Sequence, residues 1–159
     1  IKFPGGKGTW PAFWMMGNAG GWPNCGEIDI MEHVGSIPNR ASFALHTVEK
    51  NGTRGNNWHA TKMFDYSLAD DFHTYAVEWA QEEKDGKDVI RFFVDGVQYA
   101  EQWEAKIDNN DSWPFNKPHF IILNLAIGGT MGGSVDDAIF NVPRIMYVDY
   151  VRVYQRTEK

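Results

Sequence analysis

The sequence predicts an all-β fold, and three observations support that prediction. Aromatic residues are frequent, with seven Trp, six Tyr and ten Phe, and aromatic side chains favour strands. Sixteen Gly and seven Pro supply many turn positions. Apolar runs of strand length recur between turn signals, and no long helical periodicity is present. A chain of 159 residues is long enough for one domain with its own core, which is the organisation we expect.

About seven strands and one β-hairpin are expected. Asp95-Gly96 separates the apolar runs Arg91–Val94 and Val97–Gln102, and it predicts a two-residue hairpin turn because both turn positions need positive φ. Polar stretches rich in Gly, Asn and Pro are expected to form loops at the rims of the sheets. The expected strands are Gly8–Met16, Glu27–His33, Ser42–Thr47, Phe72–Trp79, Val89–Val94, His119–Leu125 and Tyr147–Tyr154, and the expected loops are Ser36–Arg40, Glu49–Asn57 and Asp108–Lys117.

Composition narrows the class of partner. The net charge is −6 and the basic residues form no stripe, so nothing favours binding to nucleic acid or to an anionic membrane. No run of eighteen apolar residues occurs, so no membrane-spanning helix is expected. Cys25 is the only cysteine, which rules out a disulfide within the chain and a thiolate-rich metal site. A neutral polymer therefore fits better as a partner.

One strand carries an unusual set of acids. Glu27, Asp29 and Glu32 fall within six residues of an otherwise apolar run, although acids are depleted in strands and their burial is unfavourable. With a period of two, Glu27 and Asp29 share one face and Glu32 points to the other, into the hydrophobic layer. An extra residue near Ile30 or Met31 would return Glu32 to the first face. We therefore predict a β-bulge at this position.

The three acids suit the cleavage of a glycosidic bond. Retaining glycosidases hold two carboxyl groups ~5–5.5 Å apart, whereas inverting enzymes need ~6.5–9.5 Å. The side chains of Glu27 and Glu32 are long enough to approach each other above Asp29, which favours the shorter separation between their carboxyl groups. Glu27 would then be the nucleophile and Glu32 the general acid/base. Asp29 would raise the pKa of Glu32 when ionised, or hydrogen-bond Glu27 when protonated.

Several other residues could line a cleft for sugar. Trp10 and Trp14 share one face of the first strand, where they could pack in the core or stack on the flat face of a pyranose. Trp22 lies in a Gly-rich loop just before the acid strand and is expected to be exposed in the cleft, and Trp113 is a weaker candidate. Asn124 could bond a sugar hydroxyl or serve as a strand amide.

Three segments together resemble glycoside hydrolase family sixteen: Gly8–Met16, Trp22-Pro23 and Gly26–Glu32, with further similarity through Phe72–Trp79, Ile122–Gly129 and Tyr147–Tyr154. The sequence is most similar to the laminarinase-type branch, the endo-β-1,3-glucanases. The resemblance implies a concanavalin-like jelly-roll β-sandwich with a substrate cleft across its concave sheet, and the same roles for Glu27, Asp29 and Glu32. It also favours sugar binding by Trp10 and Trp14.

The resemblance implies two further site residues. His46 ends a strand beside the acid strand, and the family places a histidine there, from which it could orient Glu32. Asp149 interrupts the last apolar strand, where the family often holds a structural calcium ion. No cofactor is required for the chemistry.

Complete all-β domains of this kind run roughly 200–250 residues, and their acid motif lies near the middle. Residues 1–159 are therefore expected to form one catalytic domain that lacks its N-terminal strands. Exposed strand edges would then favour a homodimer, a strand-swapped assembly or the binding of a missing N-terminal fragment.

The function expected from these features is endo-hydrolysis of β-1,3-glucan or mixed-linkage β-glucan by a secreted enzyme, because the polymer cannot enter a cell. A hydrolase of agar or carrageenan-type galactans from the same family is one alternative, although sulfated substrates usually call for Arg or Lys in the cleft. A glucan-binding fragment with impaired catalysis is the other.

Overall fold

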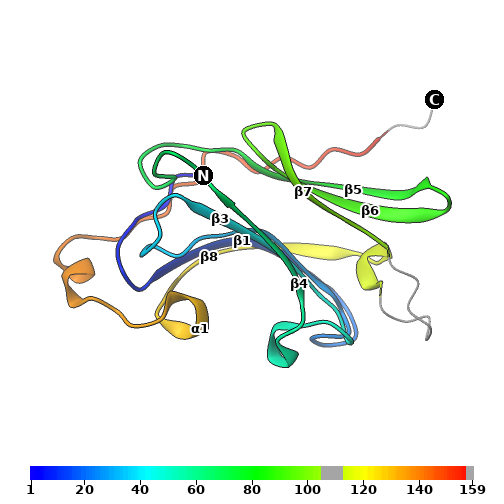
Figure 1. The fold of residues 1–159 in the computed structure, drawn as a ribbon, viewed down its shortest axis with the longest axis horizontal. Helices are drawn as coiled ribbons and strands as arrows, with labels where there is room; N and C mark the ends of the chain where they lie inside the picture. The colour runs from blue at the N-terminus through cyan, green and yellow to red at the C-terminus, as the bar shows by residue number, and fades with distance from the viewer. Residues whose placement is uncertain (105–112, 157–159) are drawn as a thin grey trace.

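The computed structural model describes residues 1–104 and 113–156, which form two antiparallel β-sheets stacked on each other (Figure 1). The larger sheet has five strands in the order β4-β3-β2-β1-β8, and the smaller has three in the order β5-β6-β7. The all-β prediction is thus confirmed. The strands are β1 (Thr9–Gly17), β2 (Glu27–Glu32), β3 (Arg40–His46), β4 (Trp58–Met63), β5 (Tyr75–Lys84), β6 (Lys87–Val94), β7 (Val97–Trp103) and β8 (His119–Ile127).

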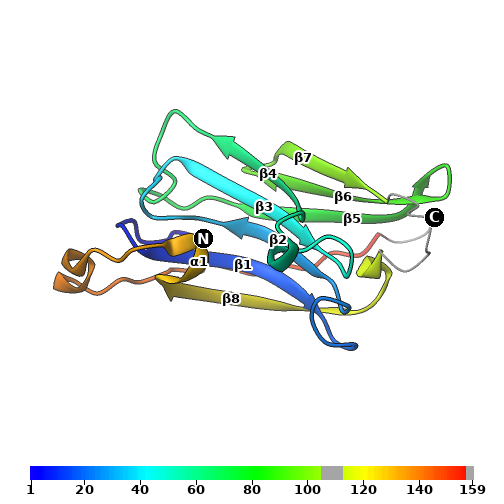
Figure 2. The same cartoon turned by 60° about the horizontal axis from the view of Figure 1, so that its bottom comes forward.

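Helical structure within residues 1–104 and 113–156 is limited to short turns in the connections: η1 (Gly52–Arg54), η2 (Pro114–Asn116), α1 (Gly129–Gly132) and η3 (Asp137–Asn141). Figure 2 shows the strands of the larger sheet lying side by side, and η1 lies in the connection between β3 and β4. In the described part of the chain, no helix has the length and apolarity needed to cross a membrane.

The hydrophobic core lies between the two sheets. Ile28 of β2 and Phe43 of β3 are fully buried, as is Phe92 of β6 on the facing sheet. The rings of Phe43 and Phe92 lie 5.5 Å apart between centroids. Trp58 stacks on Phe92 at 5.3 Å. Each such side chain contributes about 1.5–3 kcal/mol by leaving water, so this layer holds the larger sheet in place and leaves its other face available for a site.

A β-bulge interrupts β2 where the acid motif predicts it. The residues on either side of Ile30 pair with consecutive residues of β1, so Ile30 is the extra residue. The pairing with β3 shifts between Asp29 and Glu32 as well. Ile30 and Met31 are both buried in the core despite being neighbours in sequence. The bulge prediction is confirmed, and its effect is to place Glu32 on the same face as Glu27 and Asp29.

The predicted hairpin is also confirmed. Asp95 and Gly96 join β6 to β7, with φ of 51° and 78°. Positive φ at both turn positions matches the right-handed twist of the two strands.

One strand was absent from the predicted set. β4 pairs with β3 at the edge of the larger sheet, and only alternate residues such as Trp58 and Ala60 pack against the core. His59 and Met63 are exposed, which is ordinary for an edge strand. With few apolar residues in its short sequence, β4 lacks the run of hydrophobic residues that predicts the other strands.

The strand predicted at Tyr147–Tyr154 is wrong for this structure. Tyr147 forms a single bridge with Lys2, and the remainder of the segment belongs to no strand. Val153 and Tyr154 are 80% and 81% exposed. The apolar pattern is typical of a strand, but a strand forms only where a neighbour supplies its hydrogen bonds, and beyond Lys2 the described residues supply none.

Deletion of Ile30 should remove the bulge and turn Glu32 toward the core, because a one-residue shift moves every later side chain to the opposite face. Burial of an unpaired carboxylate should lower the free energy of unfolding by about 3–5 kcal/mol. The control Ile30→Val keeps the bulge and should cost only about 1 kcal/mol. Urea unfolding followed by tryptophan fluorescence measures both, and equal losses would contradict the role given to the bulge.

Candidate active site

Three carboxyl groups share the face of β2 that points away from the core. Glu27 and Glu32 are partly exposed at the two ends of the strand, and Asp29 between them is only 2% exposed. Alternation places Glu27 and Asp29 on this face, and the bulge adds Glu32. The site is therefore carried by a single strand in the middle of the larger sheet.

Two indole groups donate hydrogen bonds to the two glutamates. Nε1 of Trp10 on β1 donates to Oε1 of Glu32 at 3.0 Å. Nε1 of Trp22, in the loop before β2, donates to Oε2 of Glu27. The structure thus brings both tryptophans to the acids through a contact that the sequence did not suggest: each indole N–H stabilises the ionised form of one carboxyl group. Sugar binding by these rings stays a prediction.

Trp14 and Asn124 extend the same face toward β8. Ala12 of β1 pairs with Asn124, and Trp14 pairs with Ile122. Nε1 of Trp14 donates to Oδ1 of Asn124 at 2.8 Å. Trp14 is partly buried and Asn124 is exposed. These two predicted substrate residues therefore lie on neighbouring strands, next to the acids of β2.

His46 contacts a different acid from the one expected. Its Nε2 lies 3.1 Å from Oδ2 of Asp29 and 4.0 Å from Oε1 of Glu27. Among the described residues, His46 has no contact with Glu32, so the expected orientation of Glu32 by this histidine is not what the structure shows. The reason is register: His46 pairs directly with Glu27 at one end of β2, whereas Glu32 pairs with Ser42 at the other end.

Trp113 is not placed to bind substrate. Its Nε1 donates to Oδ2 of Asp88 at 3.0 Å, and its ring packs edge-on against the buried Phe115 at 4.9 Å. It belongs to the partly buried residues around the hydrophobic core. The prediction of a cleft position for Trp113 is therefore wrong, because the core of the sandwich and Asp88 offer its ring and N–H better partners than solvent.

Burial and mutual repulsion raise the pKa of all three carboxyl groups. Burial and the charge of Asp29 raise the pKa of Glu27 to about 7. Burial, and then the charge of Glu32, raise the pKa of Asp29 well above its ordinary value. Burial raises the pKa of Glu32, while the Trp10 hydrogen bond opposes that rise. The three groups therefore titrate as one set.

The Glu27–Asp29 pair is best described as sharing one proton. Their carboxyl groups are within hydrogen-bonding reach of each other, and two adjacent carboxylates do not both ionise readily. Asp29 is the more deeply buried of the two, so the neutral form is favoured there. The contact between the two groups acts the other way, because it raises the pKa of Glu27 and lowers that of Asp29. When Glu27 is ionised, the indole N–H of Trp22 donates to its carboxylate.

Glu27, Asp29 and His46 also lie close enough to be considered as metal ligands, because one ligand atom from each falls within 4.8 Å of the others. The histidine argues against a metal ion. Its Nδ1 accepts a hydrogen bond from the backbone N–H of Gly52 at 3.0 Å, so the neutral ring carries its proton on Nε2, the atom that faces the acids. A metal would need a lone pair at that atom.

The calcium ion expected at Asp149 stays a prediction. Asp149 is exposed, and its charge acts on the nearby N-terminal amino group of Ile1. Among the described residues, it is not part of a cluster of potential ligand side chains.

The loop predicted at Glu49–Asn57 follows β3, but sequence reasoning missed its role beside the acids. Asn51 is buried at the start of η1, and the next residue, Gly52, bonds His46. The Asn-Gly dipeptide is a strong turn signal, and it could have identified a tight turn here. Nothing in the sequence indicates that the turn closes on His46.

Comparison with known proteins agrees with the geometry. A family model described as glycosyl hydrolases family 16 matches residues 1–149. The chain is 38% identical to the β-glucanase of Rhodothermus marinus, over 99% of this chain and 56% of that protein. It is 36% identical to the keratan-sulfate endo-1,4-β-galactosidase of Sphingobacterium multivorum, over 97% of this chain and 35% of that protein.

A solved structure supports the fold. The laminarinase from Flavobacterium sp. UMI-01 superposes with a TM-score of 0.75 at 40% sequence identity, covering 87% of this chain and 58% of that one. The predicted jelly-roll sandwich is confirmed by this likeness. The chain spans about half the length of the β-glucanase and the laminarinase that it matches.

Glu27→Gln should change how stability depends on pH. Because the folded state raises the pKa of Glu27 from 4.5 to about 7, it binds this proton more tightly than the unfolded chain does, and stability falls as pH rises through that interval. The variant has no carboxyl group at position 27 and so does not lose stability in this way. The free energy of unfolding of the variant minus that of the unmodified chain should therefore rise by about 2–3 kcal/mol between pH 4.5 and pH 7.5.

Urea unfolding at several pH values measures this difference. Glu78→Gln, which alters an exposed acid of β5, should show a nearly constant difference across the same range. A constant difference for Glu27→Gln would contradict the raised pKa of Glu27.

Proposed function

This chain belongs to family 16 of the glycosyl hydrolases, and from that premise we propose that it hydrolyses internal bonds of a neutral β-glucan with retention of anomeric configuration. The proposed substrate is β-1,3-glucan, such as laminarin, or mixed-linkage β-glucan. One observation carries the proposal: Glu27 and Glu32 lie on one face of a bulged strand, each with its own indole donor. The buried carboxyl group of Asp29 lies between them.

The proposed reaction has two displacements. In the first, the carboxylate of Glu27 attacks the anomeric carbon while Glu32 gives its proton to the leaving glycosidic oxygen, so a glycosyl ester forms and the glycosidic bond breaks. In the second, the carboxylate of Glu32 takes a proton from water, whose oxygen attacks the anomeric carbon and releases Glu27. Two inversions give overall retention. No cofactor takes part.

The electrostatics of the site support these roles. Burial raises the pKa of Glu32, which favours the protonated form that the first step needs. Glu27 must be ionised to attack, which requires the shared proton to lie on Asp29 at that step, and the deeper burial of Asp29 favours its neutral form. The indole N–H of Trp22 adds a donor to the carboxylate of Glu27.

The surroundings of the acids support a neutral sugar polymer. Trp10 and Trp14 offer aromatic surface on β1, and a pyranose can stack on such rings while its hydroxyl groups meet polar neighbours. Oδ1 of Asn124 is engaged by Trp14, which leaves the NH2 group of this amide as a donor for a sugar hydroxyl. The substrates named for the β-glucanase and laminarinase relatives agree with this. Because such a polymer stays outside cells, we propose an extracellular location.

A galactan is the second candidate substrate. The observation in its favour is the 36% identity to a relative named as a keratan-sulfate galactosidase. Among the described residues, the hydrogen-bond and ion-pair partners of the three acids include no Arg or Lys, whereas a sulfated sugar would favour cations nearby. A substrate panel therefore distinguishes the two.

The test compares the unmodified chain with Glu27→Gln and Glu32→Gln, by release of reducing ends from laminarin, lichenan and agarose. Both variants should lose activity on laminarin by on the order of 10³-fold or more, because each lacks a group required in the displacement. Glu78→Gln, on the smaller sheet, is the matched control and should keep full activity.

Proton NMR of the first products gives the stereochemistry, and the β-anomer should appear first. Equal activity in all variants, no activity of the unmodified chain on any of the three polymers, or initial release of the α-anomer would each refute the proposal. Activity confined to agarose would support the galactan alternative.

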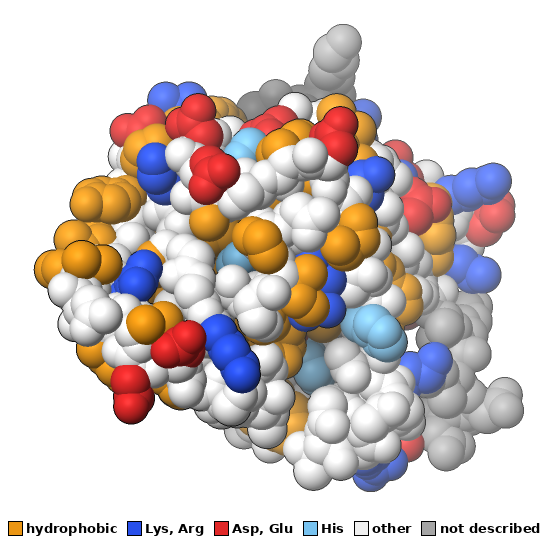
Figure 3. Space-filling model, turned by 60° about the vertical axis from the view of Figure 1, so that its left-hand side comes forward, with side chains coloured by type: hydrophobic (Ala, Val, Ile, Leu, Met, Phe, Trp, Pro, Cys, Tyr) orange, Lys and Arg blue, Asp and Glu red, His pale blue; other side chains and the backbone are white. Residues whose placement is uncertain are grey.

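We further propose that the chain on its own self-associates through the segment 147–154. This segment, red in Figure 1, runs in extended form, and after the bridge between Lys2 and Tyr147 it pairs with no strand among the described residues. Its large apolar side chains are exposed, as are others on the surface, including those that gather at the left margin of Figure 3. A second copy could supply the hydrogen bonds and apolar contacts that the segment lacks. The exposed apolar residues of the segment are Tyr147, Val148, Tyr150, Val151, Val153 and Tyr154.

Val153→Lys should shift the chain toward the monomer, because a cation at this 80% exposed position opposes apolar pairing. Light scattering after size-exclusion chromatography measures the mass of the unmodified chain and of the variant. Met63→Lys, at a 52% exposed position on β4, is the matched control and should leave the mass unchanged. A monomeric unmodified chain at about 100 μM would overturn the proposed self-association.

A further inference from the structure

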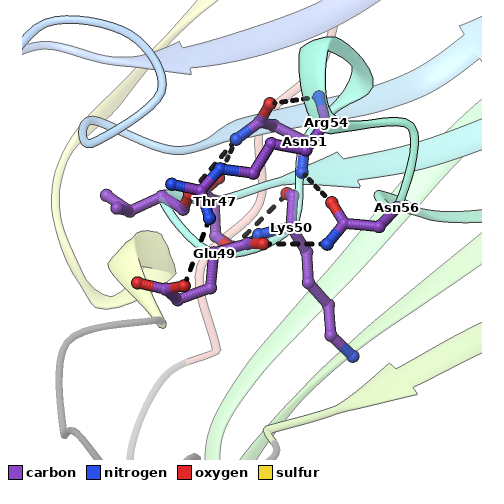
Figure 4. A network of polar contacts seen from close by, with 7 residues as sticks. Thr47, Glu49, Lys50, Asn51, Arg54 and Asn56 are labelled. Carbon is purple, nitrogen blue, oxygen red and sulfur yellow. Dashed lines mark hydrogen bonds and ion pairs between the residues drawn. The ribbon is translucent and has the colours of Figure 1, made fainter.

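Asn51 is the centre of a hydrogen-bonded loop between β3 and β4, shown in Figure 4. It is 2% exposed. Its Nδ2 donates to the carbonyl oxygens of Thr47 and Val48 at 3.1 and 3.2 Å. Its Oδ1 accepts from the backbone N–H of Arg54 at 3.1 Å. One side chain thus ties both ends of a short loop together, which restrains the backbone between them.

Further contacts close the same loop. The backbone N–H of Asn51 donates to Oδ1 of Asn56 at 3.2 Å, and Nδ2 of Asn56 donates to the carbonyl oxygen of Glu49 at 3.1 Å. Gly55 ends η1 in the left-handed conformation, with φ of 67°. Each end of η1 is therefore fixed by a specific partner, as the termini of a helical turn require.

The loop places one backbone donor on the active-site histidine. The N–H of Gly52 donates to Nδ1 of His46 at 3.0 Å. The backbone also lies close to the ring, since a Cβ atom at position 52 would sit 3.2 Å from Cε1 of His46. With Nδ1 engaged as an acceptor, the neutral imidazole must carry its proton on Nε2.

That proton faces an oxygen that needs a donor. Nε2 of His46 is 3.1 Å from Oδ2 of Asp29. This oxygen is buried and has no hydrogen-bond partner among the described residues, and Nε2 of His46 is the nitrogen that lies within reach of it. A buried oxygen without a donor is unfavourable by about 1–3 kcal/mol, and His46 in its Nε2–H form is the group positioned to supply the bond. The opposite tautomer would present a lone pair to the oxygen.

We propose that Asn51 is a positioning residue for the active site, which holds the N–H of Gly52 on His46 and thereby keeps His46 as an Nε2–H donor to Asp29. With Oδ2 occupied in this way, any proton that Asp29 holds can reside only on Oδ1. The order of contacts is thus Asn51, Gly52, His46, Asp29 and Glu27. The effect on catalysis rests on the function proposed above, whereas the effect on His46 does not.

The test reads the tautomer and the activity separately. Two-dimensional ¹H–¹⁵N NMR of the imidazole rings, under conditions that leave histidines neutral (about pH 8.5), should show His46 of the unmodified chain in the Nε2–H form alone. Asn51→Ala removes every side-chain bond of the loop centre and should give a mixture of the two tautomers. It should lower kcat on laminarin by about 10–100-fold, the usual effect of losing an outer positioning group, with KM changed less than threefold.

Two more variants separate positioning from stability. Asn51→Ser keeps an acceptor for the η1 terminus but loses the bonds to Thr47 and Val48. Its tautomer mixture and its kcat should therefore lie between those of Asn51→Ala and those of the unmodified chain. It replaces Asn51→Ala in the test if that variant does not fold. Asn39→Ala is the matched control, because Nδ2 of Asn39 ties a different loop to the carbonyl oxygen of Phe64 at 2.8 Å. It should lower stability while leaving the His46 tautomer and kcat unchanged.

The proposal is overturned if the unmodified chain shows the Nδ1–H form or a mixture. It is overturned as well if the soluble Asn51 variants keep a pure Nε2–H signal, or if Asn39→Ala alters His46 equally. A tautomer change without measurable hydrolysis by any form of the chain would support the positioning role and count against the proposed function instead.

Discussion

Three carboxyl groups that repel one another when ionised share one face of a six-residue strand, and the site depends on how that repulsion is contained. The β-bulge at Ile30 causes this repulsion, because it brings Glu32 to the face of Glu27 and Asp29. The same bulge lets Ile30 and Met31 both enter the core. The energy gained by burying these two apolar side chains therefore supports an arrangement of acids that would otherwise oppose folding.

Each acid meets a donor from a different part of the chain. Trp10 of β1 contacts Glu32, Trp22 of the preceding loop contacts Glu27, and His46 of β3 lies against Asp29. Because each donor comes from a separate element, the protonation state of one acid can differ from that of its neighbours. Such separation of roles among chemically similar groups is what acid–base chemistry at a single sugar requires.

The two faces of the larger sheet have different roles: one packs in the core and the other carries the site. One face packs against the smaller sheet through residues such as Phe43 and Phe92, and it makes the strand positions rigid. The other face carries polar and aromatic side chains that contact one another by directed hydrogen bonds. Precision at the acids thus derives from packing on the reverse side of the same strands, while loops such as the one centred on Asn51 adjust the final contacts.

Local sequence determined most of the strands, the Asp95-Gly96 hairpin and the β2 bulge, because period-two alternation, turn chemistry and the unfavourable burial of Glu32 are all properties of neighbouring residues. Tertiary structure alone decided that Tyr147–Tyr154 would not form a strand, since strand formation needs a partner that local sequence cannot supply. It also decided that Trp113 would bond Asp88 and that His46 would meet Asp29 rather than Glu32. Strand register and loop closure set these contacts by joining residues far apart in the chain, and no local pattern encodes which side chains then meet.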